Sequence, residues 1–208
     1  ELNVGMLGMH GNYAPNKLTN ECDVLIAIGM RFDDRVTGDL SKYAKQAKVI
    51  HIEIDAAEIN KNVTANIPVL GDAKEVLTKL TPLVDEKSHE TWLERFKAFE
   101  KEEIDEVIKE ELNPSKDIIS MGEVISQIND LSNGDNVIVT DVGQHQMVAC
   151  RYAHFKQTKS MITSGGLGTM GFCLPAAIGA KMGVPDKQVI AVIGDGGFQM
   201  TIQELGTI

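Results

Sequence analysis

The chain has 208 residues, of which 43% are apolar and 24% are charged, and its formal net charge is −10. This composition is ordinary for a globular protein, and the length suits one large domain or two small ones. The acidic balance argues against a general nucleic-acid or anionic-membrane surface, and no apolar run reaches the length of a membrane span. We therefore expect no nucleic acid and no membrane among the partners.

The cysteines and the chain ends indicate the origin of the sequence. Cys22, Cys150 and Cys173 are scattered without a CxxC pair. An odd number of isolated cysteines is typical of a reducing compartment, so we expect buried apolar thiols and a cytoplasmic protein. The sequence has no initiator Met, and residues 198–208 stop inside a predicted helix. We interpret the chain as an excised piece of a longer protein.

The first third of the chain alternates strand and helix signals. Apolar, β-branched runs predict strands at 23–29, 48–55 and 68–72, with helices at 56–62 and 73–84. Strands that are separated by helices indicate a parallel sheet with right-handed crossovers. This region is therefore predicted to be an α/β domain.

The next segment differs in character. Residues 85–112 are dense in Glu and Lys, and their aromatic and aliphatic residues are spaced as one helical stripe. Asn113-Pro114 is expected to end this helix, because the residue before a proline avoids the helical region. We interpret 85–116 as a charged helical linker between two domains, with its acidic side chains on a solvated face.

The α/β pattern resumes in the second domain, 117–208. Short apolar strands again alternate with helices, which predicts a second parallel sheet. The predicted strands are 136–140, 161–163 and 189–193, and the predicted helices are 120–131, 146–154 and one that carries Pro175 near its start.

Three loops of the second domain, 141–146, 164–171 and 194–198, each follow a strand and open a helix. Parallel strands place such loops at one edge of the sheet, where helix N-termini favour anions. Asp195, between glycines at the tip of its strand, could hold a hard cation through oxygen. His145 is better placed to donate to a phosphate than to act as a general base. Each loop alone could be a simple turn, but together they predict a site for a metal-bound diphosphate.

A second interpretation of this region is a dinucleotide site. Gly166 to Gly171 satisfies G-x-G-x-x-G after a strand, and Asp195 stands where a Rossmann domain has its ribose-binding acid. The strand before the glycines is short, however, and ends in polar Thr163-Ser164. Two glycines follow Asp195 and suit close phosphate contact. An NAD-dependent dehydrogenase is therefore the less favoured alternative.

A charged loop at 29–38 follows the first strand of the first domain. Its two arginines and two aspartates could pair with each other, or they could hold the diphosphate and hydroxyls of a nucleotide cofactor. Glu53-Ile54 and Gly71 to Ala73 lie near the tips of the next two strands, which suits one elongated ligand across the sheet edge. His10 lies in another glycine-containing loop and could touch the same cofactor.

Several segments make the chain similar to a known family. The chain resembles the acetolactate synthase (acetohydroxyacid synthase) large subunits, which are thiamine-diphosphate enzymes. The match runs along almost the whole chain and is weakest across 85–116. It is carried by residues 5–11, RFDDRVTG at 31–38, VGQHQM at 142–147, ITSGGLGTMG at 162–171, LPAAIGA at 174–180 and GDG at 194–196.

The resemblance implies a subunit of three domains. Residues 1–84 would be the C-terminal portion of a central, Rossmann-like FAD-binding domain, and 117–208 the N-terminal portion of the thiamine-diphosphate domain. The implied enzyme decarboxylates pyruvate on thiamine diphosphate and joins the hydroxyethyl unit to a second 2-oxoacid, either pyruvate or 2-oxobutyrate. The products, 2-acetolactate and 2-aceto-2-hydroxybutyrate, belong to branched-chain amino-acid biosynthesis, which leads to valine and isoleucine.

The resemblance also implies site residues. Asp195 would bind Mg²⁺. Gly168 would accept a hydrogen bond from the aminopyrimidine and Met170 would hold the cofactor bent, so both would serve catalysis. The diphosphate contacts would be Gly143, Gln144, His145, Gly196 and Gly197. FAD, largely structural here, would be lined by Gly8, Met9, His10, Gly29, Arg31, Asp33, Arg35, Val36, Glu53, Ile54, Asp72 and Ala73.

The family further implies a homodimer or higher homo-oligomer and leaves room for a regulatory small subunit. Its activating glutamate lies in the absent N-terminal domain and comes from the partner subunit, so we expect 1–208 alone to be inactive. Other thiamine-diphosphate enzymes, such as pyruvate oxidase or glyoxylate carboligase, are alternatives. RFDDRVTG together with GQHQM argues against them.

Overall fold

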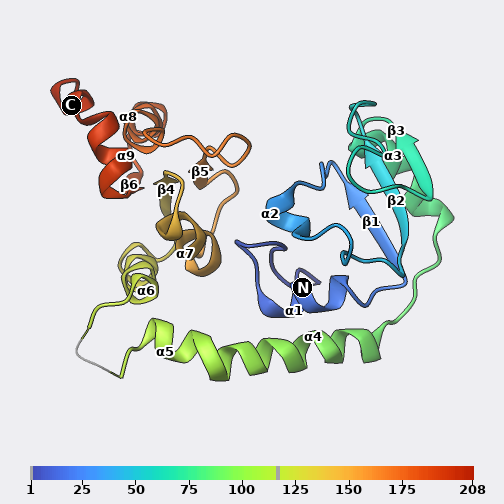
Figure 1. Cartoon of the computed structure of the whole chain (residues 1–208). Helices are drawn as coiled ribbons and strands as arrows, with labels where there is room; N and C mark the ends of the chain where they lie inside the picture. The colour runs from blue at the N-terminus through green and yellow to red at the C-terminus, as the bar shows by residue number, and fades with distance from the viewer. Residues whose placement is uncertain (1, 116–117) are drawn as a thin grey trace. The chain divides into compact units, whose positions relative to one another are not determined.

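The computed structural model describes residues 2–115 and 118–208, and the chain divides into two compact units, Glu1–Glu103 and Ile104–Ile208 (Figure 1). The division falls inside the segment predicted as a linker. The predicted junction at 116–117 lies outside the described residues. Each unit has its own parallel sheet with helices, so both are of the α/β class predicted from the sequence.

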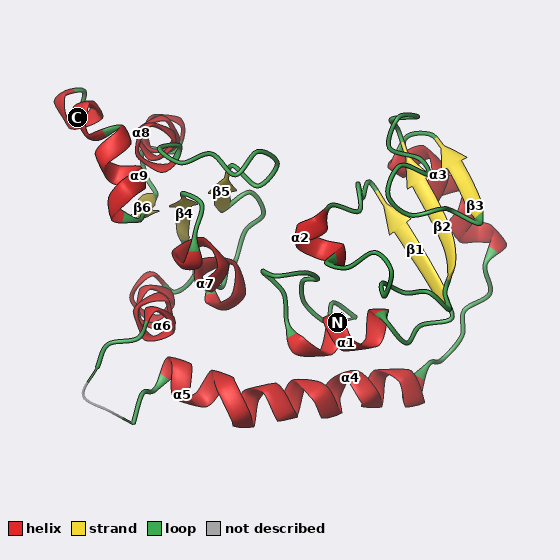
Figure 2. Cartoon of the chain, in the orientation of Figure 1, coloured by secondary structure: helices red, strands yellow, loops and turns green. Residues whose placement is uncertain are grey.

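The first unit is built on a three-stranded parallel sheet in the order β1-β2-β3 (Figure 2). The strands are β1 (Val24–Ile28), β2 (Lys48–Glu53) and β3 (Ile67–Leu70). They pair in register with Ile26 beside Ile50 and Ile50 beside Ile67. One face of this sheet packs on a core that contains Phe32 and Tyr43. The predicted parallel sheet is confirmed.

Some helices of the first unit differ from expectation. Helix α1 (Tyr13–Thr19) was not predicted; it packs against α4 (Glu90–Glu103), with the rings of Tyr13 and Phe99 meeting edge to face at 5.4 Å. The helix predicted at 56–62 is wrong, because turns occupy that segment. Asp55 accepts a hydrogen bond from the amide of Ala57 at 2.9 Å, a local bond that competes with helix formation.

Two further helices complete this unit. The short helix α2 (Asp34–Thr37) lies within the charged loop at 29–38 and was not predicted. Helix α3 (Ala73–Leu80) continues into the 3-10 turn η1 (Thr81–Leu83), and the carboxylate of Asp72 caps its start. The predicted segment 73–84 is therefore helical over most of its length.

The second unit holds the sheet β5-β4-β6, also parallel. Its strands are β4 (Asn136–Thr140), β5 (Met161–Thr163) and β6 (Gln188–Val192). Every residue of β4 is buried, as expected of the central strand of a sheet covered on both faces. Ile138 packs in one core cluster with α6 and α7, and Val137 and Val139 pack in another with α8.

Helices surround this sheet in the predicted order. The unit begins with the π-helical segment η2 (Ile104–Ile108) and α5 (Lys109–Leu112), which ends just before Asn113-Pro114 as predicted. The other helices are α6 (Met121–Ser132), α7 (Gln144–Tyr152), α8 (Cys173–Gly183), α9 (Asp195–Met200) and the 3-10 helix η3 (Ile202–Gly206). Over the described residues, no helix is both long and apolar enough to cross a membrane.

Candidate functional site

The three loops of the second unit lie at one edge of its sheet. Strand β4 pairs with both neighbours, and Thr140 stands beside Thr163 of β5 and Val192 of β6. The segments 141–146, 164–171 and 194–198, which follow these strands, therefore leave the sheet side by side. We call them the loop cluster. The structure thus brings together the loops that the sequence pattern predicted to meet.

Glycines let the members of the loop cluster approach closely. A Cβ on Gly194 would lie 3.3 Å from Cε1 of His145, and one on Gly196 would lie 3.2 Å from Cε of Met170. Gly168 has φ +62° and faces Val142, whose Cγ2 would lie 3.6 Å from an added Cβ. Bare backbone from one loop therefore packs against side chains from another.

A buried carboxylate ties the loop cluster together. Asp141 is only 1% exposed, and its two oxygens accept hydrogen bonds from the amides of Gly171 and Cys173, each at 3.1 Å. A Cβ on Gly197 would fall 1.6 Å from Asp141 Oδ2, so this glycine lies directly on the carboxylate. Asp141 is absent from the predicted site residues, although its place directly after a buried strand was a signal for it.

His145 is a neutral donor in this setting. Burial lowers its pKa, and the negative charge of Asp141 opposes that shift only in part. Its Nε2 is buried and has no hydrogen-bond partner within the part of the chain that the structure describes. A neutral imidazole offers one N–H and one lone pair. His145 can therefore donate to an oxygen of a ligand in the loop cluster.

Asp195 is exposed and opens α9, with Gly194 as the N-cap. In residues 2–115 and 118–208, no group of three or more His, Cys, Asp and Glu side chains is placed to hold a metal ion. A cation at Asp195 would therefore need oxygens from the backbone or from the ligand itself. This requirement suits Mg²⁺, which prefers one or two carboxylates together with phosphate oxygens.

The glycine-rich loop after β5 carries Gly168 and Met170, the two residues predicted to serve catalysis, and both are exposed. The side chain of Met170 is half exposed, with its methyl end against Gly196. The amide of Gly168 donates to the carbonyl of Ser164 at 2.6 Å, which closes the loop into a turn. The exposed backbone at Gly143 and Gln144 completes an open surface that a diphosphate could contact. The residues present fit thiamine diphosphate.

The predicted FAD residues of the first unit come from neighbouring segments. Met9 donates its amide to the carbonyl of Arg35 at 2.8 Å, and a Cβ on Gly8 would lie 2.5 Å from that same oxygen. Gly8, Met9, Arg35 and Val36 all line one pocket of about 360 Å³. A Cβ on Gly29 would meet nothing within 4 Å, so the backbone at the tip of β1 is open to a ligand.

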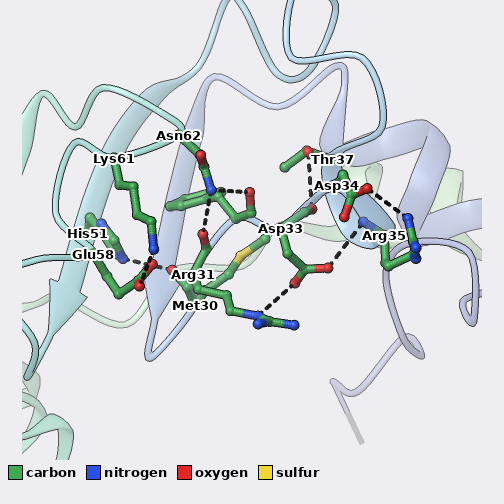
Figure 3. Close-up of polar contacts among 11 residues, drawn as sticks. Met30, Arg31, Asp33, Asp34, Arg35, Thr37, His51, Glu58, Lys61 and Asn62 are labelled. Carbon is green, nitrogen blue, oxygen red and sulfur yellow. Dashed lines mark hydrogen bonds and ion pairs between the residues drawn. The ribbon is translucent and has the colours of Figure 1, made fainter. Parts of the chain in front are cut away.

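The arginines of the charged loop are paired in this structure. Arg31 Nε lies 3.3 Å from Asp33 Oδ2, and Arg35 Nη1 lies 2.7 Å from Asp34 Oδ2 (Figure 3). Both arginine side chains are more than half exposed. Exposed ion pairs of this kind contribute little stability, so a diphosphate could replace the aspartates at small cost. The group of residues therefore fits the anionic part of FAD.

Two carboxylates at this edge have structural partners. Glu53 is buried, and its Oε1 accepts from the amides of Ile54 and Asp55 at 2.8 and 3.2 Å. Asp72 accepts from the amide of Glu75 at 3.1 Å as the cap of α3, whose first residue is Ala73. Their side chains shape the strand tips, whereas Ile54 is 70% exposed and His10 is partly exposed.

Comparison with protein families gives two matches. Residues 1–80 match the family described as "Thiamine pyrophosphate enzyme, central domain", and residues 141–208 match "Thiamine pyrophosphate enzyme, C-terminal TPP binding domain". The second match contains the whole loop cluster, including the G-x-G-x-x-G run. That run therefore belongs to a thiamine-pyrophosphate domain, which removes the support for a dinucleotide site.

Curated relatives match over nearly the whole chain. A "Probable acetolactate synthase large subunit" of Methanocaldococcus jannaschii is 49% identical over 100% of the chain, and an "Acetolactate synthase large subunit" of Lactococcus lactis is 47% identical over 100%. The "Acetolactate synthase isozyme 3 large subunit" of Escherichia coli is 44% identical over 98%. The chain spans 36% of the length of each of these relatives. The chain belongs to the thiamine-pyrophosphate enzymes, within the family of acetolactate synthase large subunits.

Proposed function

We propose that this chain provides the flavin-binding region and part of the thiamine-diphosphate site of an acetolactate synthase. The observation that carries the proposal is the meeting of three loops around Asp141 at one sheet edge, within the segment that matches a thiamine-pyrophosphate-binding domain. The names of the relatives support the same activity. The substrates would be pyruvate and 2-oxobutyrate, used in branched-chain amino-acid biosynthesis.

The loop cluster would hold the cofactor through its backbone and through the side chains of Gln144, His145, Met170 and Asp195. Asp195 would bind Mg²⁺, and the backbone of Gly143, Gly196 and Gly197 would face the diphosphate with Gln144 and His145. Thiamine diphosphate, when bound, supplies a carbanion that adds to a 2-oxoacid carbonyl and accepts the electrons released with CO₂. The carbonyl of Gly168 would accept a hydrogen bond from the aminopyrimidine, and Met170 would hold the bound cofactor in a bent shape, so both residues would orient it.

The first unit would hold FAD at its sheet edge. Arg31 and Arg35 would contact the diphosphate with the exposed backbone around Gly29, while Gly8, Met9 and Val36 would line the adjoining pocket. His10, Asp33, Glu53, Ile54, Asp72 and Ala73 complete the proposed set. In this role FAD would be largely structural, and Glu53 and Asp72 would act mainly by fixing the strand tips.

The assembly and compartment follow from the same proposal. The whole protein would work as a homodimer or a higher homo-oligomer in the cytoplasm, with or without a regulatory small subunit. Residues 1–208 alone would not turn over pyruvate, since they span about a third of the relatives. Acetolactate formation by the purified chain would contradict this point.

The decisive experiment uses the full-length protein with thiamine diphosphate and Mg²⁺. Asp195→Asn should lower cofactor affinity and acetolactate formation from pyruvate by at least roughly 100-fold, because it removes the charged metal ligand. Asp186→Asn changes an exposed aspartate between α8 and β6 and is the matched control. Equal activity of the two variants, or formation of a different product from pyruvate, would refute the proposal.

A further inference from the structure

The charged loop of the first unit contains an unusual backbone conformation. Phe32 has φ +52° and is only 2% exposed. A bulky L-residue adopts this left-handed conformation only where its surroundings impose it, and such residues concentrate at functional sites. Phe32 also stands between Arg31 and Asp33, two residues of the proposed flavin site.

Side-chain hydrogen bonds to three consecutive carbonyls hold this conformation (Figure 3). The Nε2 of His51 lies 2.9 Å from the carbonyl oxygen of Met30. The Nδ2 of Asn62 donates to the carbonyls of Arg31 and Phe32, at 3.2 and 3.1 Å. We call His51 and Asn62 the carbonyl clamp. His51 lies in β2 and Asn62 lies shortly before β3, so both hydrogen-bond the loop from other segments of the unit.

Aromatic packing fixes the same loop from its inner side. The ring of Phe32 meets His51 at 5.0 Å and Tyr43 at 6.3 Å, both edge to face. With Phe32 turned into the core, Arg31 and Asp33 on either side face outward, where their side chains pair at 3.3 Å. The conformation of one buried residue therefore sets the direction of two exposed ones.

His51 can act only through this loop. It is fully buried in β2, so no ligand in solvent can reach it. A carbonyl oxygen only accepts, so Nε2 carries the proton. Glu53 Oε2 lies 4.0 Å from Nε2, while the other oxygen of Glu53 accepts from the amides that follow β2. The N–H of the imidazole is thus used in the hydrogen bond to the carbonyl of Met30.

The loop that the clamp holds leads directly into α2. Asp33 Oδ1 accepts from the amide of Arg35 at 3.1 Å and so caps this helix. Residues 34–38 then form one wall of the pocket of about 360 Å³. Movement of the clamped carbonyls would displace this cap and the pocket wall that depends on it.

We propose that His51 and Asn62 are positioning residues for the flavin site: they hold the loop at Met30–Phe32 so that Arg31, Asp33 and the start of α2 are preset for the ligand. This inference rests on the proposed binding of FAD. It adds two residues that are absent from the predicted site and that act through their hydrogen bonds to the loop.

The test compares two exposed asparagines in the full-length protein. Asn62→Ala removes the bonds to the loop, whereas Asn66→Ala removes a side-chain-to-backbone bond elsewhere in the unit, in which Asn66 Oδ1 accepts from the amide of Val49 at 2.7 Å. FAD affinity, measured by quenching of flavin fluorescence, should fall about tenfold in Asn62→Ala and less than about twofold in Asn66→Ala, because two hydrogen bonds preorganise the site. Melting temperatures of the FAD-free variants report general destabilisation separately.

A conservative exchange tests the second clamp residue. His51→Gln keeps an N–H donor and should bind FAD more tightly than His51→Leu, which keeps bulk without a donor. Equal affinities of Asn62→Ala and wild type, or an equal loss in Asn66→Ala, would overturn the clamp while leaving the flavin site intact. Wild-type protein that binds no FAD would instead overturn the proposed flavin site and the inference with it.

Discussion

The two sheet edges of this chain prepare for anionic ligands in different ways. In the second unit, three loops meet on one buried carboxylate, Asp141, and present mainly bare backbone. In the first unit, one loop carries exposed arginines, and its backbone carbonyls are hydrogen-bonded by the side chains of His51 and Asn62. The backbone groups of the second unit are therefore positioned by the buried carboxylate of Asp141. The exposed arginines of the first unit are instead positioned by the conformation of the loop that carries them.

The largest expected effect comes from removing the buried charge. Asp141→Ala leaves the amides of Gly171 and Cys173 unsatisfied, which should lower the free energy of unfolding by about 2–5 kcal/mol. Asp34→Ala removes an exposed carboxylate of the first unit and should change it by less than about 0.5 kcal/mol. Urea unfolding of both variants measures the difference. Equal decreases in the free energy of unfolding would contradict the structural importance of Asp141 relative to the exposed Asp34.

Two glycines with positive φ allow the steric cost of an added Cβ to be distinguished from the cost of the backbone conformation. Gly8 has φ +83° and no room, since a Cβ would lie 2.5 Å from the carbonyl of Arg35, whereas Gly29 has φ +61° and open space. Gly8→Ala should cost about 2–4 kcal/mol and Gly29→Ala about 1–2 kcal/mol. Thermal unfolding with and without FAD checks this order. A greater loss in Gly29→Ala would show that space is not the deciding factor.

The smallest expected effect is the pH dependence that His145 contributes. Burial lowers its pKa, so the unfolded chain binds this proton more readily than the folded chain. Above the ordinary pKa of about 6.5, His145 therefore does not reduce the free energy of unfolding. As the pH falls below that value, the unfolded chain takes up the proton more readily, and the free energy of unfolding decreases. His145→Gln should therefore flatten the loss of stability on acidification. Denaturation profiles of variant and wild type that coincide at every pH would contradict this.

Local sequence patterns predicted most of the architecture. The strands predicted at 136–140 and 161–163 coincide with β4 and β5. Short runs of apolar and β-branched residues favour buried strands of a parallel sheet. The meeting of the loop cluster also followed from the sequence, since parallel strands must release their loops at one edge. The helix predicted at 56–62 failed because side-chain bonds of Asp55 and Asn60 close turns there.

Contacts across long separations had no local signal. Helix α1 is stabilised by packing on α4, about 80 residues further along the chain, and its seven residues are too few to be stable alone. The sequence left open whether Arg31 and Arg35 pair with the neighbouring aspartates, and only the side-chain geometry showed which aspartate each arginine contacts.

The sequence by itself determined the two parallel α/β units, the order of their strands along the chain and the family, because apolar periodicity and motif spacing are local properties of the chain. Only the tertiary structure showed that Asp141 bonds amides 30 and 32 residues away, and that His51 and Asn62 hold a left-handed Phe32. Hydrogen bonds are directional and short, so which groups make them depends on how the backbone has already folded. Both sites therefore depend on hydrogen bonds whose partners only the folded backbone identifies.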